Sequence, residues 1–263
     1  MSDVIREYNT PHPVSWSRAW QTDPLGGDLS EEWPRLIACF RATAPLGSVA
    51  PECKGKLLDG SDFDLNAYRG KKSVLIVFGS YACPPCVTNV NRATPNLNGL
   101  YEKYGDAVEF LYVYTREAHP GKLITPHESL EDKIRNATRL KNEENVTFPI
   151  LIDDLEGTIQ KSYADPQFNN PVFLVNKAGR IAYKSAWLDS SELPQVLEDQ
   201  VLWDQRSATD LTIKKTFSER IRLLREPFDP VCNQRIKRLM EEIGLAQKDM
   251  GPIPGIETDR ADK

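Results

Sequence analysis

The sequence has few residues of the kinds that build metal sites, disulfide frameworks or membrane spans. Its 263 residues include 5 cysteines, 3 histidines and 3 methionines. No run approaches the ~18 consecutive apolar residues of a membrane helix, and the longest compact apolar run, residues 74–78, has the length of a strand. A disulfide-dense scaffold and a transmembrane helix are therefore disfavoured.

An excess of basic charge is also missing. The chain has 33 lysines and arginines against 38 aspartates and glutamates, for a net charge of −5, which gives no electrostatic signature of nucleic-acid binding. The first ten residues carry Asp3, Arg6 and Glu7 and no apolar segment, so they do not resemble a secretory signal. We expect a cytoplasmic protein without a nucleic-acid or membrane partner.

What the sequence does contain is an alternation of strand-like and helix-like patterns from Gly47 to about Gln200. This alternation is typical of α/β architecture around a central sheet. Residues 74–78 are apolar on both faces and predict a central strand, and residues 176–179 (NKAG) predict a hairpin turn. Strands are predicted over 73–80, 108–114, 149–152, 172–176 and 180–185, and helices over 86–104, 129–141, 155–163 and 191–203.

Two extensions flank this domain. We divide the chain into an N-terminal extension (1–46) with a short helix ending near Ala42, an α/β domain (47–204), a basic amphipathic helical extension (205–249) and a tail (250–263) expected to be flexible. In the third part the apolar residues fall on one helical stripe. We expect a helical pair that packs on the domain or on a second copy in a homodimer. The stripe consists of Ile213, Phe217, Ile221 and Leu224.

The strongest chemical signal is the segment from Cys83 to Cys86 (CPPC), between a predicted buried strand and a predicted helix. A helix N-terminus presents unsatisfied N–H groups and a partial positive charge, which stabilise a thiolate at Cys83. Cys86, one turn later, is placed to attack a mixed disulfide formed at Cys83. The two prolines fit the first helical turn. We expect Cys83 to be the solvent-facing reactive thiol and Cys86 the buried one.

Half of a zinc site is the alternative for two cysteines at this spacing. It is disfavoured because the sequence has no second Cys-x-x-Cys and no histidine at ligand spacing. The Asp153-Asp154 pair predicts a helix cap. We therefore predict no metal and no other cofactor. Cys39, Cys53 and Cys232 show no partner spacing and are interpreted as packing or incidental thiols.

Three ordered blocks of the sequence resemble those of the iodothyronine deiodinases: residues 78–85 (FGSYACPP), 114–120 (YTREAHP) and 127–132 (HESLED). Residues 50–71 resemble the opening of redoxin-type thioredoxin-fold proteins. The resemblance covers about residues 47–200. It implies a thioredoxin-like three-layer α/β/α sandwich, here with N-terminal and C-terminal helical extensions.

The resemblance places Cys83 where deiodinases carry their catalytic selenocysteine. Glu117, His119 and His127 match acidic and histidine positions implicated in proton transfer and substrate binding in that family. The chain departs from the family in having cysteine for selenocysteine, in having Cys86 in place of a phenylalanine, and in the expected lack of an N-terminal membrane anchor.

Pro171 marks another departure, because the family carries a substrate-binding arginine there. It resembles the cis-proline of thioredoxins, which faces the dithiol and offers backbone groups to a substrate. Glu117 and His119 follow a predicted strand end, as Cys83 does, so parallel strands bring all three to one sheet edge. An imidazole there is suited to proton transfer near neutral pH. Tyr81 is a predicted lid or contact on the dithiol.

The sequence therefore predicts a thiol-disulfide oxidoreductase with Cys83 as nucleophile and Cys86 as resolving thiol. Pro171 would shape the substrate groove, and His119 with Glu117 would assist proton transfer. Its expected partner is a thiol reductant or a disulfide protein. Alternatives are a deiodinase-like reductive dehalogenase or other reductase of a small-molecule substrate, and a non-redox binding or scaffolding module using the basic C-terminal helices. A peroxiredoxin is disfavoured because Ile76 occupies the expected proline position.

Overall fold

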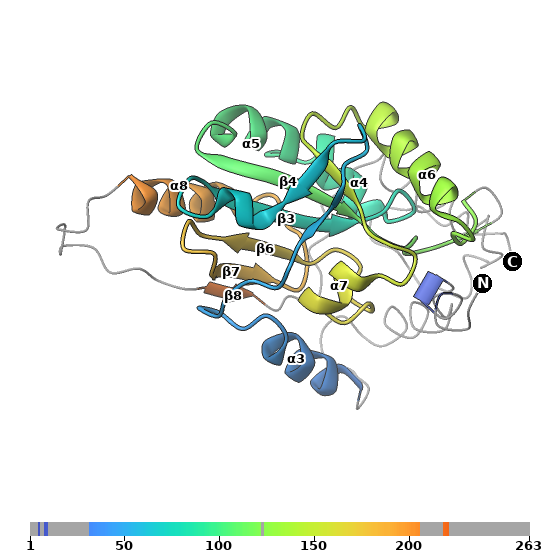
Figure 1. Ribbon diagram of the computed structural model, residues 1–263, viewed down its shortest axis with the longest axis horizontal. Coiled ribbons are helices and arrows are strands. Elements are labelled where there is room, and N and C mark those ends of the chain that lie inside the picture. The colour runs from blue at the N-terminus through green and yellow to red at the C-terminus, as the bar shows by residue number, and fades with distance from the viewer. Residues whose placement is uncertain (1–4, 6–7, 10–31, 122–123, 206–217, 221–263) are drawn as a thin grey trace, which may run out of the picture.

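A central mixed sheet organises the structure, a computed structural model that describes residues 5, 8–9, 32–121, 124–205 and 218–220 (Figure 1). The strand order is β5-β4-β3-β6-β7-β8. The strands are β3 (Ser73–Gly79), β4 (Val108–Tyr114), β5 (Ile150–Ile152), β6 (Val172–Val175), β7 (Ile181–Ser185) and β8 (Ser218–Arg220). Two short strands, β1 (Lys54–Lys56) and β2 (Asp62–Asp64), form a separate antiparallel pair, followed by a 3-10 turn at Leu65–Tyr68.

Strand directions decide which chain segments meet at the end of the central strand. β3, β4 and β5 are parallel, and Gly79 pairs with Tyr114 where β3 and β4 end. β6 runs antiparallel to β3, so its beginning lies at that same edge. β7 returns antiparallel to β6 through the predicted turn, in which Gly179 has φ 73° and donates its N–H to the Asn176 carbonyl at 2.8 Å.

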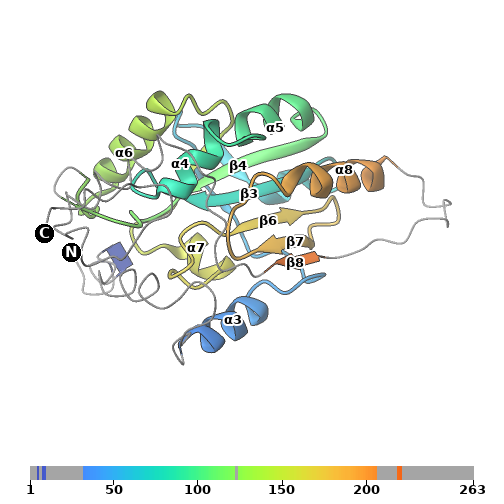
Figure 2. The ribbon, with the colours of Figure 1, turned by 180° about the vertical axis from the view of Figure 1, so that it is seen from behind.

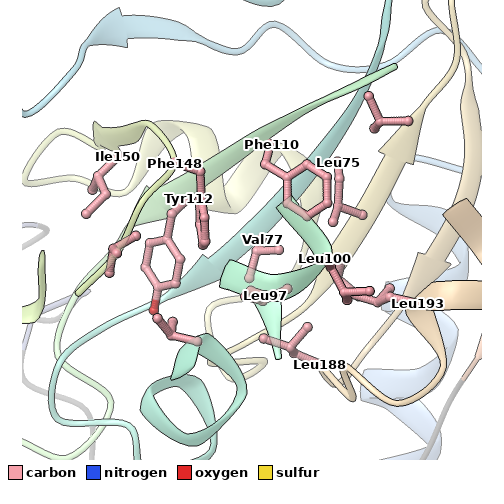
Figure 3. Packing of buried hydrophobic residues seen from close by; sticks show 14 of the residues in the cluster. Leu75, Val77, Leu97, Leu100, Phe110, Tyr112, Phe148, Ile150, Leu188 and Leu193 are labelled. Atoms are coloured by element: carbon pink, nitrogen blue, oxygen red, sulfur yellow. The ribbon is translucent and has the colours of Figure 1, made fainter. Parts of the chain in front are cut away.

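Helices cover both faces of the sheet (Figures 1 and 2). Leu75 and Val77 of β3 pack with side chains of α4 (Pro84–Asn91), α5 (Leu97–Tyr104), α6 (Leu130–Glu143) and α8 (Leu193–Asp204). Figure 3 shows part of this cluster. Val74, Ile76 and Phe78 point the other way, toward α3 (Glu32–Ala42) and α7 (Thr158–Tyr163). This alternation along a buried strand confirms the predicted three-layer α/β/α sandwich.

The predicted helix over 86–104 is two helices. Pro95 cannot continue a helix, and the Asn96 side chain accepts the Gly99 N–H at 2.9 Å, which begins α5 afresh. α6 starts with a reciprocal capping box between Ser129 and Asp132. Within the described ranges, no helix is both long and apolar enough to cross a membrane.

The predicted N-terminal helix is confirmed as α3. Lys184 of β7 is fully buried, and its ammonium group donates to the carbonyl oxygens of Phe40 at 2.7 Å and Thr43 at 3.2 Å, at the end of α3. This contact satisfies carbonyl groups that a helix leaves unpaired at its C-terminus.

The expected C-terminal helix is wrong at Ser218–Arg220, which form strand β8 parallel to β7. Glu219 lies opposite Lys184 and its carboxylate is 3.4 Å from the buried ammonium. An open sheet edge and an ion pair therefore override the local helical pattern at these three residues. The apolar stripe, the rest of the helical extension beyond residue 205 and the tail lie outside the described residues.

Candidate active site

Cys83 occupies the N-cap of α4, as the motif predicts. Pro84 and Pro85 fill the first two helical positions and have no N–H. The first amide of the helix is therefore that of Cys86, at the third position, which is where an N-cap side chain finds a donor. The Cys83 side chain makes no capping hydrogen bond to this amide, so the helix acts on the sulfur through the positive end of its dipole.

Both thiols are buried, which corrects the expectation of a solvent-facing Cys83. The exposed fractions are 1% for Cys83 and 0% for Cys86, and neither residue is in a disulfide. Ala118 packs with both side chains in a small apolar cluster. The segment that follows β4 thus folds over the start of α4, a tertiary contact that the position of Cys83 at a helix start does not reveal.

The ends of β3 and β4 bring this segment to the dithiol, as predicted for parallel strands. The Thr115 N–H donates to the Gly79 carbonyl at 3.0 Å, which continues the ladder past the last strand pair. The Ala118 N–H donates to the Ser80 hydroxyl at 3.0 Å. Residues 115–118 are therefore tied to residues 79–80, immediately before the motif.

Glu117 is the centre of a buried hydrogen-bond network. Its Oε2 accepts the N–H of Ala82 at 2.8 Å, and its Oε1 accepts the hydroxyl of Tyr114. The Tyr114 hydroxyl in turn accepts the N–H of Tyr81 at 3.1 Å. Burial and the charge of Glu117 raise the pKa of Tyr114 well above its usual range, so the hydroxyl keeps its proton and remains a donor. The carboxylate thus holds the two residues that precede Cys83.

His127 is the imidazole paired with Glu117. Its Nε2 lies 3.1 Å from Glu117 Oε1, and both side chains are fully buried. Asn136 of α6 donates to the same carboxylate oxygen at 3.2 Å. The expectation that Glu117 supports His119 is not what the structure shows, since the carboxylate turns toward α6 and meets His127 instead.

His119 is also buried, at the segment that covers the thiols. Desolvation, with a further contribution from the charge of Arg116, lowers the pKa of His119 to about 3. The imidazole is therefore neutral near neutral pH and would enter a reaction as a base or hydrogen-bond donor, not as an imidazolium acid.

Arg116 fixes the segment from its other side. Its guanidinium donates to the carbonyls of Glu117 at 3.2 Å and Pro166 at 2.7 Å, and to the side-chain oxygen of Asn169 at 3.1 Å. Burial lowers the pKa of this group. The segment that covers the dithiol is thereby joined to the chain just before β6.

Tyr81 is half-buried and reaches from the motif to α6. Its hydroxyl donates to Glu143, and the guanidinium carbon of Arg139 lies 4.8 Å from its ring centroid. Arg139 and Glu143 are themselves paired at 2.8 Å. Tyr81 is thus anchored on α6 by a cation–π contact and a hydrogen bond, and its role as a lid on the dithiol stays a prediction.

Pro171 lies directly before β6, next to β3, and its carbonyl accepts the N–H of Phe78 at 3.0 Å. The cis-proline expectation is wrong, because the cis peptide bond in the described part of the chain is Thr94–Pro95. The backbone before Pro171 instead continues the extended ladder, with the Asn170 carbonyl accepting the N–H of Leu188 at 2.9 Å.

The Asn170 side chain was not expected at the site. It is fully buried, and neither its oxygen nor its nitrogen has a hydrogen-bond partner among the described residues. The register of β6 on β3 places it at the sheet edge where β3 ends. An unpaired buried amide at this edge is a candidate contact for a polar group of a substrate.

Tyr114 and Asn136 were likewise missed by sequence reasoning. Asn136 offers a signal in retrospect, because it is a polar residue among Lys133, Ala137 and Leu140 on the buried stripe of α6. Tyr114 ends an otherwise apolar strand. In the described residues, no group of three or more His, Cys, Asp or Glu side chains is arranged to hold a metal ion.

These features define a thioredoxin-like fold with a dithiol at the start of the helix that follows its central strand. The family model named Redoxin matches residues 45–197. The chain therefore belongs to the Redoxin family.

Known relatives agree with the resemblance seen in the sequence. The chain is 29% identical over 146 residues to the thyroxine 5-deiodinase of Gallus gallus, covering 51% of this chain and 55% of the relative. It is 27% identical over 146 residues to the Homo sapiens thyroxine 5-deiodinase, covering 51% and 46%. The chain thus spans about half the length of the curated relatives it matches. The deiodinase-like redoxin resemblance is confirmed.

Solved structures with a similar arrangement include the thioredoxin domain of a thiol-disulfide oxidoreductase from Bacteroides vulgatus. The TM-score is 0.46 at 24% identity, covering 59% of this chain and 97% of that chain. A thioredoxin-family thiol:disulfide interchange protein from Chlorobium tepidum has a TM-score of 0.43 at 15% identity, covering 59% and 97%.

Proposed function

We propose that the protein is a thiol-disulfide oxidoreductase acting through Cys83 and Cys86. The observation that carries the proposal is the placement of Cys83 at the N-cap of α4 with Cys86 one turn later, both as thiols. Two thiols one turn apart, with the first at the positive end of a helix dipole, are suited to thiolate chemistry.

The reaction balances as a two-electron exchange. The Cys83 thiolate attacks one sulfur of a partner disulfide, forms a mixed disulfide and releases one partner thiolate. Cys86, as its thiolate, then attacks the Cys83 sulfur, forms the protein disulfide and releases the second partner thiolate. The partner gains the two electrons, and solvent protonates its thiolates. A thiol reductant returns the protein to the dithiol.

Burial of Cys83 adds a requirement. Cys83 is 1% exposed and packs with Ala118, so we infer that a partner's sulfur reaches it only after this contact opens. We therefore expect a small disulfide to react faster than a folded protein disulfide of equal reduction potential. We also propose a cytoplasmic location, where thiol reductants keep such a pair reduced.

The test uses Cys86→Ser, in which resolution is removed. With glutathione disulfide, a mixed disulfide should accumulate and map to Cys83 by peptide mass spectrometry, whereas Cys39→Ser should behave as the unaltered protein. The proposal is overturned if Cys83→Ser still reduces disulfides at the original rate. That result would place the reaction at another thiol, whereas an unaltered protein that reduces no disulfide at all would favour a scaffolding role.

Reductive dehalogenation is the second candidate, favoured by the deiodinase relatives and by the Glu117–His127 pair behind the motif. Here the Cys83 thiolate would attack the halogen, the carbon would take a proton, and Cys86 would displace halide from sulfur as the disulfide forms. Halide release from an iodinated phenol by the reduced protein, lost in Cys83→Ser, would support this reaction. No halide release together with rapid disulfide reduction would exclude it.

A further inference from the structure

The hydroxyl of Tyr112 lies beside the sulfur of Cys86. Tyr112 is a fully buried residue of β4, and it pairs with Val77 of β3. A Cβ atom placed on Gly79 would be 2.1 Å from the Tyr112 hydroxyl oxygen and 2.8 Å from Cys86 Sγ. The two atoms therefore approach the same point over β3, and only a glycine at position 79 leaves room for both.

In the described part of the chain this hydroxyl has no well-aligned hydrogen-bond partner, and a hydrogen-bonding contact with the Cys86 side chain is among the causes that raise its pKa. Most buried polar groups in proteins have a hydrogen-bond partner. Tyr114, two residues further along the same strand, donates its hydroxyl to Glu117. Figure 3 shows Tyr112 on the opposite side of the apolar cluster from Leu193, with the hydroxyl oxygen at the end of the ring.

The proton on this hydroxyl is firmly held. Burial, with the neighbouring Cys86 and Cys83 as further causes, raises the pKa of Tyr112 well above its usual range. The group is therefore a neutral donor throughout the pH range in which thiols titrate.

We propose that the Tyr112 hydroxyl donates a hydrogen bond to the Cys86 thiolate and acts as a catalytic residue in the resolving step. This inference rests on the proposed disulfide exchange. In the forward direction the Cys86 thiolate attacks the Cys83 sulfur and expels the partner's thiolate. In the reverse direction a reductant thiolate attacks Cys83, the Cys83–Cys86 bond breaks, and Cys86 leaves with the electron pair.

Cys86 is the sulfur that needs such a donor. It is fully buried, so its thiolate has no water to solvate the charge. Cys83 lies at the N-cap of α4, at the positive end of the helix dipole, whereas Cys86 lies inside the first turn. A donor in apolar surroundings contributes more than the same donor in water.

The experiment compares Tyr112→Phe with Tyr104→Phe. Tyr104 also has a buried hydroxyl and packs in the same apolar cluster, at the end of α5, where its polar neighbour is Lys103. In a Cys83→Ser background, the pH dependence of alkylation at Cys86 is followed by peptide mass spectrometry. Tyr112→Phe should slow the alkylation of Cys86 near neutral pH by about 10-fold or more, and Tyr104→Phe should leave its rate unchanged.

A second measurement separates this inference from the function on which it rests. In otherwise unaltered protein, the mixed disulfide on Cys83 should form at the original rate in Tyr112→Phe, and its resolution should slow by about 10- to 100-fold. Failure of the adduct to form in any variant would overturn the disulfide-exchange function. Normal adduct formation with resolution and Cys86 alkylation within twofold of the Tyr104→Phe control would overturn the role of Tyr112.

Discussion

Replacing Glu117 by alanine tests whether its carboxylate holds the motif. The carboxylate accepts from the Ala82 amide, the Tyr114 hydroxyl and Asn136, and pairs with His127. Each buried group left unsatisfied costs roughly 1–3 kcal/mol. Because some of these groups can find one another or water, we expect Glu117→Ala to lower the free energy of unfolding by about 3–5 kcal/mol. That is a large part of a typical total of about 5–15 kcal/mol.

Glu117→Gln separates charge from shape. A glutamine side chain keeps one acceptor oxygen, but its NH2 group would face the N–H of Ala82 or the NH2 of Asn136, so that two donors meet. We therefore expect a smaller loss in the free energy of unfolding, about 1–3 kcal/mol. Glu109→Gln is the matched control on the same strand. Its carboxylate pairs with Lys72 at 3.2 Å near the surface, and its loss should cost about 1 kcal/mol or less.

Urea unfolding followed by tryptophan fluorescence gives the stability of each variant, and reduction of glutathione disulfide gives the rate at Cys83. Because the Ala82 amide loses its acceptor, we expect Glu117→Ala to slow the reaction at Cys83 by about 10- to 100-fold under conditions where the protein is folded. If Glu117→Ala unfolds at the same urea concentration as Glu109→Gln and reacts within twofold of the unaltered protein, the network does not hold the motif.

Three further predictions concern buried groups near the sheet edge. Gly79→Ala should destabilise the protein by about 1–3 kcal/mol in thermal unfolding, since its Cβ would overlap Tyr112 and Cys86. Gly99→Ala is the control and should not destabilise the protein, because its Cβ would meet only an atom at 3.5 Å. Equal melting curves for the two variants would contradict the crowding at β3. Burial lowers the pKa of Lys133 to about 8, while an unfolded lysine titrates near ~10.4. Between these two pKa values the unfolded state binds more protons than the folded state. The free energy of unfolding in urea should therefore rise, relative to that of Lys133→Met, as the pH increases from the lower pKa to the higher one. A difference between the two proteins that does not change with pH would refute this prediction. Because the pKa of His119 is lowered to about 3, His119→Gln should leave the shape of the pH–rate profile above about pH 5 unchanged, and the loss of an inflection there would contradict a neutral imidazole.

Local patterns in the sequence determined the elements that build the site. The apolar run of β3, the Cys-Pro-Pro-Cys segment after it and the turn at residues 176–179 depend on neighbours within a few positions. The same is true of the two periodicities that distinguish strands from helices. For this reason the α/β architecture and the position of Cys83 at a helix start could be predicted from these patterns. The three-layer sandwich, with the parallel strands that bring Cys83 and Glu117 to one sheet edge, was implied by the family resemblance.

Partner choice inside the site depended on the tertiary structure. Glu117 is two residues from His119 along the chain, yet it pairs with His127. The direction of a side chain leaving a loop depends on what packs against it, and here Asn136 of α6 completes the pocket around the carboxylate. Burial of His119 likewise decides its protonation state, because desolvation is a property of the surrounding side chains.

Non-local contacts also decided the exposure of the dithiol and the edge of the sheet. Cys83 is covered because Ala118, far along the chain, packs on it, and Ser218–Arg220 form a strand because β7 offers unpaired backbone groups. The Tyr112 hydroxyl meets Cys86 only because Gly79 on the neighbouring strand lacks a side chain. In each case the deciding energy comes from atoms distant in sequence, which local propensity does not contain.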